Sequence, residues 1–159
     1  MAGLLRQAGI RFVIIGGVAA NAHGSVRVTW DLDICYDPAP DNRERLAGVL
    51  LSWGASLRGA DPSLPWVLDA RSLLINPVLT LATQRGAIDV MDRVAGVGTY
   101  GDAMARSHDV TYAGATLRVL DLDALIAAKR AASRVKDHGH LLELEALREM
   151  MKRRGAGRI

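Results

Sequence analysis

The sequence predicts one domain of mixed α/β class, in which helices flank a β-sheet that contains hairpins. The chain has 159 residues, half of them hydrophobic, which suits a single compact core. Strand-like and helical segments alternate irregularly, and turn signals of the hairpin type join several strands. This order favours a mixed sheet over a regular βαβ repeat. We expect residues 1–159 to form a single domain, with its core over 1–120 and a helical part over 121–159.

The first third of the chain predicts two strands separated by a short helix. Residues 11–15 are rich in β-branched side chains, which favour strands. Residues 31–36 alternate polar and apolar side chains, the period of a half-buried strand. The alanine-rich residues 18–23 between them favour a helix. Two further helices are expected, at 1–9 and at 41–52, the second capped by Asp41.

The rest of the chain predicts two hairpins followed by two helices. Glycine and proline interrupt residues 54–76 and glycines recur over 96–101, so we expect loops around short strands and a flexible link. The strands of the hairpins are expected at 78–83 with 87–91, and at 110–112 with 116–120. The final helices are expected from Asp121 to 132 and from about 136 to 152, the second with an apolar stripe of Leu141, Leu144, Leu147 and Met151.

A single cysteine, Cys35, excludes an internal disulfide and a cysteine-based metal cluster. It lies in an apolar strand-like run, so we expect a buried free thiol and a reducing, cytoplasmic location. Arg6 and Arg11 with the apolar run 12–20 have the outline of a secretory signal, but the run is short and two glycines break it. No run approaches the roughly 20 apolar residues that span a bilayer, so no membrane association is expected.

The net charge is +3 and the isoelectric point about 9.4. An excess of this size fits either a solvated terminus or a weak attraction to a polyanion such as RNA, and it does not choose between them. Part of it lies at the C-terminal end, in Lys152, Arg153, Arg154 and Arg158.

An acidic pair lies on the expected strand at 31–36. Asp31 and Asp33 are two residues apart, so both carboxylates project from the same face. Two like charges this close raise each other's pKa, and a divalent cation removes that cost. Oxygen-only ligands select a hard ion, Mg²⁺ or Mn²⁺. On the pair alone, an edge strand with both aspartates facing solvent is an equal alternative.

Asp89 shifts this balance, because it lies in an otherwise apolar strand, where an unpartnered carboxylate is costly to bury. If its strand lies beside the first, the three carboxylates complete one metal site, with Asp89 as general base or second-metal ligand. Asp92 is a nearby competitor, but it lies at the end of the strand and is expected at the surface. Gly16 and Gly17 follow the first strand, and glycines at such a turn let the backbone approach a phosphate closely.

The residues from Ile15 to Ile34 resemble the signature of the DNA polymerase β-like nucleotidyltransferase superfamily. In that family a strand leads to a Gly-Gly or Gly-Ser turn, a helix, and then Arg-x-Thr-x-Asp-x-Asp. Arg27, Thr29, Asp31 and Asp33 match this motif position by position. The resemblance is closest to the AbiEii-type branch, which includes toxin–antitoxin nucleotidyltransferases. It implies that Asp89 is the third carboxylate and that Gly16, Gly17, Arg27 and Thr29 bind the nucleotide.

The C-terminal part is also similar to this branch, which carries a Lys…Arg-x-Lys-Asp motif. Here Lys129 is followed by Arg134 and, after Lys136, by Asp137. The resemblance implies that Lys129 and Arg134 contact the triphosphate and that Asp137 orients one of them or closes the site. Apart from the family pattern, an ordinary charged helix junction with Asp137 as N-cap explains the same residues.

Together these residues predict a Mg²⁺- or Mn²⁺-dependent nucleotidyltransferase that transfers a nucleoside monophosphate (NMP) from a nucleoside triphosphate (NTP) such as ATP to an acceptor hydroxyl. An RNA such as a tRNA, a protein side chain and a small molecule are all open as acceptors, and the chain is a candidate toxin–antitoxin component. Two alternatives remain. One is a catalytically silent protein that binds a cognate toxin or antitoxin. The other is an RNA-binding module led by the basic helix near the C-terminus.

Overall fold

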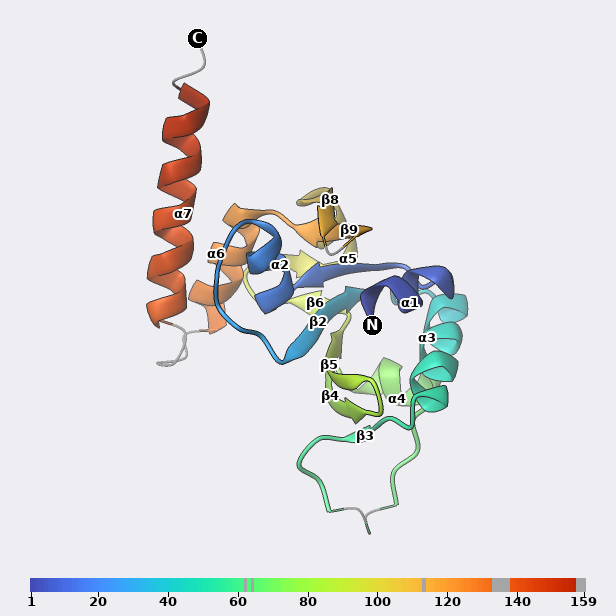
Figure 1. Ribbon diagram of the computed structural model, residues 1–159. Helices are drawn as coiled ribbons and strands as arrows, with labels where there is room; N and C mark the ends of the chain where they lie inside the picture. Colours follow the sequence, from blue (N-terminus) through green and yellow to red (C-terminus); the bar gives the residue numbers. More distant parts are fainter. Residues whose placement is uncertain (62, 64, 113, 133–137, 157–159) are drawn as a thin grey trace.

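The computed structural model describes residues 1–61, 63, 65–112, 114–132 and 138–156. A seven-stranded mixed sheet, in the order β3-β4-β5-β2-β1-β9-β8, forms its centre, and β6 and β7 form a second, two-stranded sheet (Figure 1). The predicted mixed α/β class is therefore confirmed. In chain order the elements are α1 (Ala2–Gln7), β1 (Phe12–Ile15), α2 (Gly16–Ala22), β2 (Asp31–Tyr36), α3 (Pro40–Ser52), β3 (Ser56–Leu57), α4 (Ala70–Ile75), β4 (Val78–Thr83), β5 (Gly86–Met91), β6 (Arg93–Val94), β7 (Gly98–Thr99), α5 (Tyr100–Ala105), β8 (Ser107–Tyr112), β9 (Ala115–Leu120), α6 (Leu122–Ala132) and α7 (His138–Ala156).

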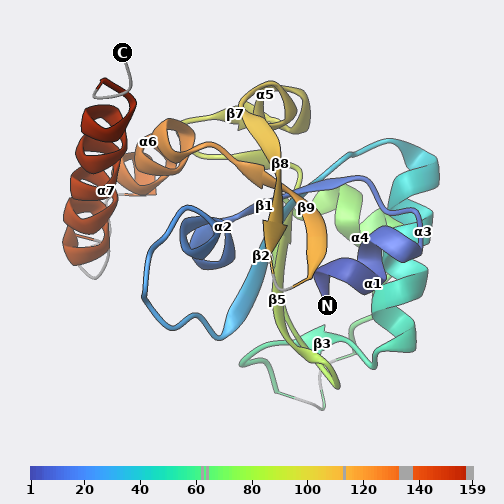
Figure 2. The ribbon, with the colours of Figure 1, turned by 45° about the horizontal axis from the view of Figure 1, so that its top comes forward.

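The sheet has two unlike faces. Figure 2 shows α1, α3 and α4 on one side of the sheet, and α2, α6 and α7 on the other. Tyr36 of β2 points to the first side, where its hydroxyl donates a hydrogen bond to the Leu73 carbonyl oxygen of α4 at 2.7 Å. Because side chains alternate along a strand, Asp31 and Asp33 point to the opposite side. The acidic pair therefore faces the half of the molecule that holds α2 and α6.

The register between β2 and β5 is fixed by apolar burial. The two strands run parallel, with Leu32 opposite Ile88 and Ile34 opposite Val90. All four side chains are buried. A slip of one residue would turn each of them to the other face, so burial specifies the pairing strongly. The same register determines which residue of β5 lies beside the acidic pair.

Two short helices, α4 and α5, lie in segments where the sequence predicts loops and a flexible link. Each begins with a capping box, in which the N-cap side chain and the residue three positions later bond each other's backbone N–H. In α4 the box joins Asp69 and Ser72, and in α5 it joins Thr99 and Asp102. The expectation of loops was wrong here because glycine and proline nearby outweighed these short capping signals.

Two helix starts also differ from the predictions. Helix α2 includes Gly16 and Gly17 as its first residues instead of beginning after them. Helix α3 begins at Pro40, so Asp41 lies inside its first turn and is not its cap; its carboxylate instead accepts hydrogen bonds from the Arg11 guanidinium at 3.0 and 3.1 Å. Asp121 does cap α6, because its Oδ1 accepts a hydrogen bond from the Ala124 N–H at 2.6 Å.

The expectation of a buried free cysteine is met. Cys35 is a buried free thiol, and burial raises its pKa to about 12. Within the described ranges, no helix has both the length and the apolar character needed to cross a bilayer.

Helix α7 joins the body of the molecule through the first part of its predicted apolar stripe. Leu144 is fully buried, and Leu141 and Leu147 pack against the core, whereas Met151 is about half exposed. Figure 1 shows the C-terminal turns of α7 extending beyond the rest of the protein. The stripe therefore docks α7 against α6 only along its N-terminal part.

This docking predicts a sharp contrast between two leucines of α7. Leu144→Ala should lower the free energy of unfolding by about 2–4 kcal/mol, because it leaves a cavity in the core. Leu142 is 67% exposed, so Leu142→Ala should change it by no more than about 0.5 kcal/mol. Urea denaturation of both variants measures the difference, and equal effects would show that α7 does not dock through Leu144.

Candidate metal centre

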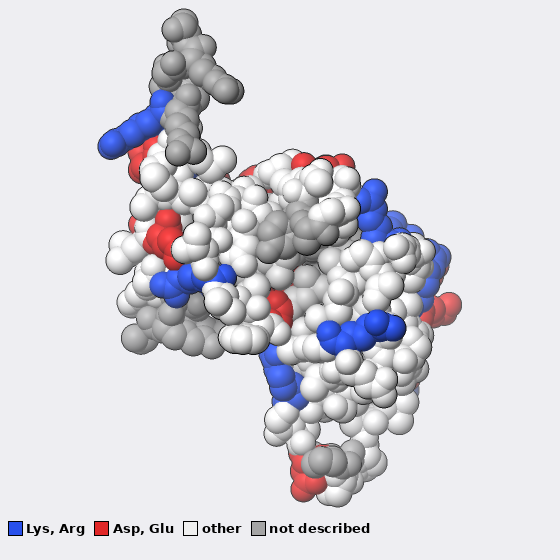
Figure 3. Space-filling view, in the orientation of Figure 1, with Lys and Arg blue, Asp and Glu red and all other residues white. Residues whose placement is uncertain are grey.

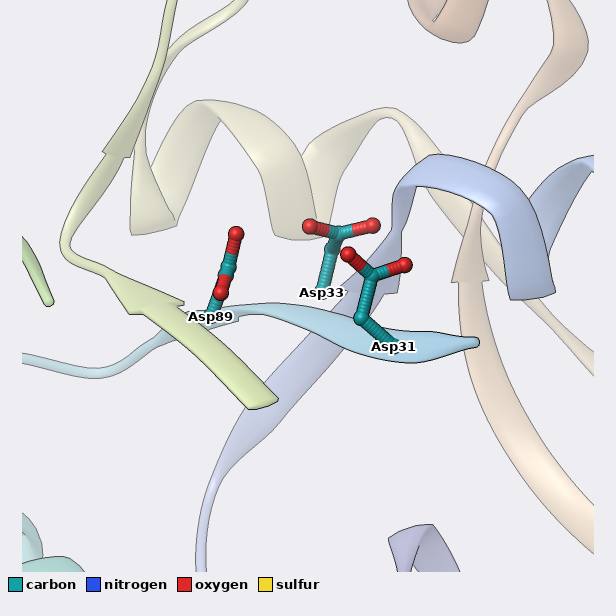
Figure 4. A group of neighbouring side chains, drawn as sticks. All are labelled: Asp31, Asp33 and Asp89. Carbon is teal, nitrogen blue, oxygen red and sulfur yellow. The ribbon is translucent and has the colours of Figure 1, made fainter. Parts of the chain in front are cut away.

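Three carboxylates from two adjacent strands converge on one point. Asp33 of β2 lies directly opposite Asp89 of β5 in the parallel register, and Asp31 is two residues earlier on β2. One oxygen from each carboxylate lies within 4.8 Å of the other two. Figure 4 shows all three side chains rising from the same face of the strands. Asp89 thus lies beside the acidic pair, and the three carboxylates together could hold a hard divalent cation.

The charge balance at this point is strongly negative. Burial of Asp33, with further contributions from the charges of Asp31 and Asp89, raises the pKa of Asp33 to about 6. A hydrogen bond from the Gly17 backbone and the positive charge of Lys129 oppose this shift but do not cancel it. Figure 3 shows acidic atoms recessed near the middle of the molecule, between basic side chains. A bound cation would remove the part of this shift that comes from the charges of Asp31 and Asp89.

Asp92 takes no part in this cluster. It is half-buried instead of lying at the surface as expected, and its Oδ1 accepts no hydrogen bond from the described residues. Its charge helps to raise the pKa values of Cys35 and Tyr36, the last residues of β2, so Asp92 lies near the C-terminal end of that strand.

Arg58 is a member of the site that the sequence did not reveal. It follows the edge strand β3, and its Nη2 donates a hydrogen bond to Asp89 Oδ1 at 2.7 Å. Its Nη1 lies 3.8 Å from Asp31 Oδ2, so one guanidinium bridges two of the three carboxylates. The side chain is 35% exposed. No local pattern marks this arginine, because only the pairing of β3, β4 and β5 brings it near Asp89.

The glycine turn between β1 and α2 lies directly against this acidic cluster. Gly16 has a φ of +63°, and a Cβ at this position would overlap Asp33 Oδ2. A Cβ on Gly17 would lie 2.5 Å from Thr29 Oγ1. Both glycines are therefore required by the protein's own side chains, whatever ligand the turn contacts.

The loop before β2 connects the acidic cluster to α7. Thr29 Oγ1 donates a hydrogen bond to Asp31 Oδ1 at 3.2 Å and so steadies that carboxylate. Arg27 Nε donates to Glu143 of α7 at 2.7 Å, and Ser25 Oγ donates to the same carboxylate at 2.7 Å. These bonds hold the pKa of Glu143 below its usual range, with Ser25 as the largest cause. Sequence reasoning did not foresee Glu143 as the partner of Arg27.

A cavity of about 650 Å³ opens above the carboxylates. It gathers every predicted site residue that lies in the described part of the chain, together with Arg58, Arg93 and His140, which were not predicted. The predicted residues on its wall are Gly16, Gly17, Arg27, Thr29, Asp31, Asp33, Asp89 and Lys129. Arg134 and Asp137 lie outside the described residues, so their expected roles stay predictions.

Known proteins resemble this chain in structure but not closely in sequence. No protein-family model matches it, and no curated protein sequence matches it. The solution structure of the antibiotic-resistance factor ANT(2'')-Ia, a nucleotidyltransferase, matches 96% of this chain and 88% of its own, with a TM-score of 0.56 and 16% identity. A crystal structure of ANT(2'')-Ia in complex with adenylyl-2''-tobramycin covers 94% and 91%, with a TM-score of 0.53 and 16% identity. The chain therefore has a nucleotidyltransferase-like fold.

The glycine turn predicts opposite effects for two Gly→Ala substitutions. Gly16→Ala should destabilise the protein by about 2–4 kcal/mol, because it combines a left-handed backbone with overlap on Asp33. Gly48 lies in α3 with open space around it, so Gly48→Ala should stabilise by about 0.5–1 kcal/mol. Thermal and urea unfolding measure both. A harmless Gly16→Ala would mean that Asp33 does not lie against this turn.

The pKa of Asp33 predicts an inverted pH dependence of stability in metal-free buffer. The folded pKa of about 6 is above the ordinary value of 3.8, so the folded state holds the proton more tightly. Stability should therefore fall as the pH rises from about 4 to 6, by on the order of 2–3 kcal/mol. Asp33→Asn should be more stable than the natural protein at pH 7.5 in EDTA, and the two should converge near pH 3.5.

The natural protein and its Asp33→Asn variant also test whether the site binds a cation. Mg²⁺ should raise the unfolding temperature of the natural protein at pH 7.5 and leave that of Asp33→Asn nearly unchanged, because bound ligand stabilises only the folded state that binds it. A loss of stability on Asp33→Asn substitution in EDTA would contradict the assigned repulsion.

Proposed function

We propose that this protein is a metal-dependent nucleotidyltransferase that transfers an NMP from an NTP to an acceptor hydroxyl. One observation carries the proposal: three carboxylates within 4.8 Å of one another form the floor of a cavity that also holds the glycine turn and Lys129. Three clustered acids are costly in a protein that only binds a partner, whereas they suit a hard cation. The nucleotidyltransferase-like fold supports the same function.

The donor set fits Mg²⁺ or Mn²⁺, because it consists of carboxylate oxygens alone. Asp31, Asp33 and Asp89 would hold the metal. An ion bound there would neutralise phosphate charge and make a nearby hydroxyl more acidic. Thr29 keeps Asp31 in place through its hydrogen bond, and the packing of Gly16 against Asp33 sets the position of that carboxylate.

The protein's own groups then divide the reaction between them. The triphosphate receives positive charge from Lys129, Arg27 and Arg134. Asp137 orients one of these cations or closes the site, and both Asp137 and Arg134 lie outside the described ranges. Asp89 accepts the proton of the acceptor hydroxyl, whose oxygen forms a bond to the α-phosphorus. The bond from that phosphorus to the bridging oxygen breaks, and pyrophosphate leaves in line. Most of the rate enhancement comes from positioning and charge neutralisation.

The biological setting belongs to the same proposal. The motif from Gly16 to Asp33 resembles the AbiEii-type branch, so we propose a role in a toxin–antitoxin pair and a cytoplasmic location. An RNA such as a tRNA, a protein side chain or a small molecule supplies the acceptor hydroxyl. The ANT(2'')-Ia complex holds an adenylylated small molecule, which shows that this fold can hold such a product.

Label transfer tests this proposal. The protein is incubated with Mg²⁺ and each α-labelled NTP, together with total RNA and cell lysate, and the label is traced to RNA, protein or small molecules. Asp89→Asn should lower transfer by about 10²–10⁴-fold, since it removes the base. Asp92→Asn, three residues away and outside the cavity, is the matched control and should keep the activity.

The result of this experiment distinguishes a nucleotidyltransferase from a protein that only binds a partner or RNA. Absence of label transfer, together with absence of NTP binding in calorimetry with Mg²⁺, would contradict the enzyme and favour a partner-binding protein. Unchanged RNA binding after Asp31→Ala and Asp33→Ala, without any transfer, would favour the RNA-binding module.

A further inference from the structure

A second cavity lies beside the metal centre, between the loop that follows β3, helix α4 and the start of β4. Its volume is about 770 Å³, and it shares Arg58, Val78 and Thr80 with the cavity above the carboxylates. We propose, on the basis of the nucleotidyl transfer proposed above, that the acceptor binds in this second cavity. We further propose that the cavity selects an acceptor with a planar apolar group and an adjacent anionic group.

The position of the cavity follows from the order of the strands. Thr80 of β4 lies opposite Asp89 of β5, so both side chains share the carboxylate face. The edge strand β3 lies beyond β4, whereas β1, which leads into the glycine turn, lies on the other side of β2. The cavity and the glycine turn therefore flank the three carboxylates from opposite sides.

In-line transfer requires the acceptor and the triphosphate to bind on opposite sides of the carboxylates, as this arrangement allows. The attacking hydroxyl and the departing pyrophosphate lie on opposite sides of the α-phosphorus. With the triphosphate toward the glycine turn and Lys129, the hydroxyl must approach from the side of β4. Asp89 is the carboxylate of the strand next to β4, so it lies where the hydroxyl proton has to go.

The side chains that line the second cavity indicate the class of acceptor. Apolar side chains are exposed in it: Val67 is 72% and Ile75 66% exposed, and Trp66 is half-buried beside them. A tryptophan face with aliphatic neighbours suits a planar ring. These are the surfaces that a nucleobase or another aromatic group contacts by stacking.

The charges of the lining point to an anion. Arg58 and Arg71 both line the cavity. Arg58 is paired with Asp89 and Asp31, whereas Arg71 forms no ion pair with any described residue and is the main cation of the lining. The acid on the wall, Asp69, is engaged as the cap of α4, where its Oδ1 accepts a hydrogen bond from the Ser72 N–H at 2.6 Å. Guanidinium groups bind phosphate and carboxylate well. A polycation such as tobramycin would meet the positive charge of Arg71 here.

A nucleotide combines a planar base with an anion, and it can come free or as the end of an RNA strand. The test therefore uses three probes: adenosine monophosphate, a short RNA with a free 3′ hydroxyl, and tobramycin. Each is titrated calorimetrically into the full-length protein, with and without Mg²⁺ and a non-hydrolysable ATP analogue. The variants are Arg71→Glu and Trp66→Ala. Arg85→Glu, in the exposed turn between β4 and β5 and outside both cavities, is the control.

The proposal expects at least one anionic probe to bind. Arg71→Glu and Trp66→Ala should each weaken that binding by about tenfold or more, since each removes a contact with one half of the probe. Arg85→Glu should bind as the natural protein does, and the affinity for the ATP analogue should not change in any variant. Binding of adenosine monophosphate would identify a free nucleotide as the source, and binding of the RNA alone would identify a strand end.

Three results would overturn it: neither anionic probe binds, both variants bind as the natural protein does, or tobramycin binds more tightly than the anionic probes. The two proposals fail separately. Failure of the ATP analogue to bind counts against nucleotidyl transfer, whereas Arg71-dependent binding of an anionic probe without nucleotide would still support the cavity as an anion-selective site.

Discussion

Repulsion among three carboxylates is the constraint around which this structure is organised. The parallel register of β2 and β5 places Asp33 beside Asp89, with Asp31 two residues away on the same face. Burial of Asp33, with further contributions from the charges of Asp31 and Asp89, raises the pKa of Asp33 to about 6. Burial of apolar side chains on the opposite face of the same strands fixes the register. It thereby offsets the free-energy cost of bringing the three carboxylates together. A folded protein thus keeps an acidic cluster that its own residues neutralise only in part, through Arg58 and Lys129.

The surroundings of the cluster are shaped to keep it in place. The glycine turn admits Asp33, and Thr29 bonds Asp31, so two of the three carboxylates are positioned by neighbouring backbone and hydroxyl groups. Arg58 differs from these supports, because its guanidinium is partly exposed and touches both cavities. A cation that takes Asp89 would release this guanidinium toward the second cavity. Arg58 lines both the cavity above the carboxylates and the second cavity, as do Val78 and Thr80.

Sequence patterns predicted the parts of this site that depend on local periodicity. The two-residue spacing of Asp31 and Asp33, and an aspartate in an otherwise apolar strand, were enough to expect a shared cluster. What could not be predicted depends on contacts between distant segments. Arg58 meets Asp89 only through the pairing of β3, β4 and β5, and Glu143 meets Arg27 only because α7 docks beside the loop before β2. Helix α4 was missed although Asp69 and Ser72 have capping spacing, because a two-residue signal is weak beside several prolines and glycines.

The most direct measurement is the anomalous diffraction of crystals grown with Mn²⁺ and a non-hydrolysable ATP analogue. We expect a strong anomalous peak coordinated by oxygens of Asp31, Asp33 and Asp89, with the Arg58 guanidinium withdrawn from Asp89. The triphosphate should lie on the side of the glycine turn. Manganese bound elsewhere, or a nucleotide bound while Arg58 still bridges Asp31 and Asp89, would contradict the account.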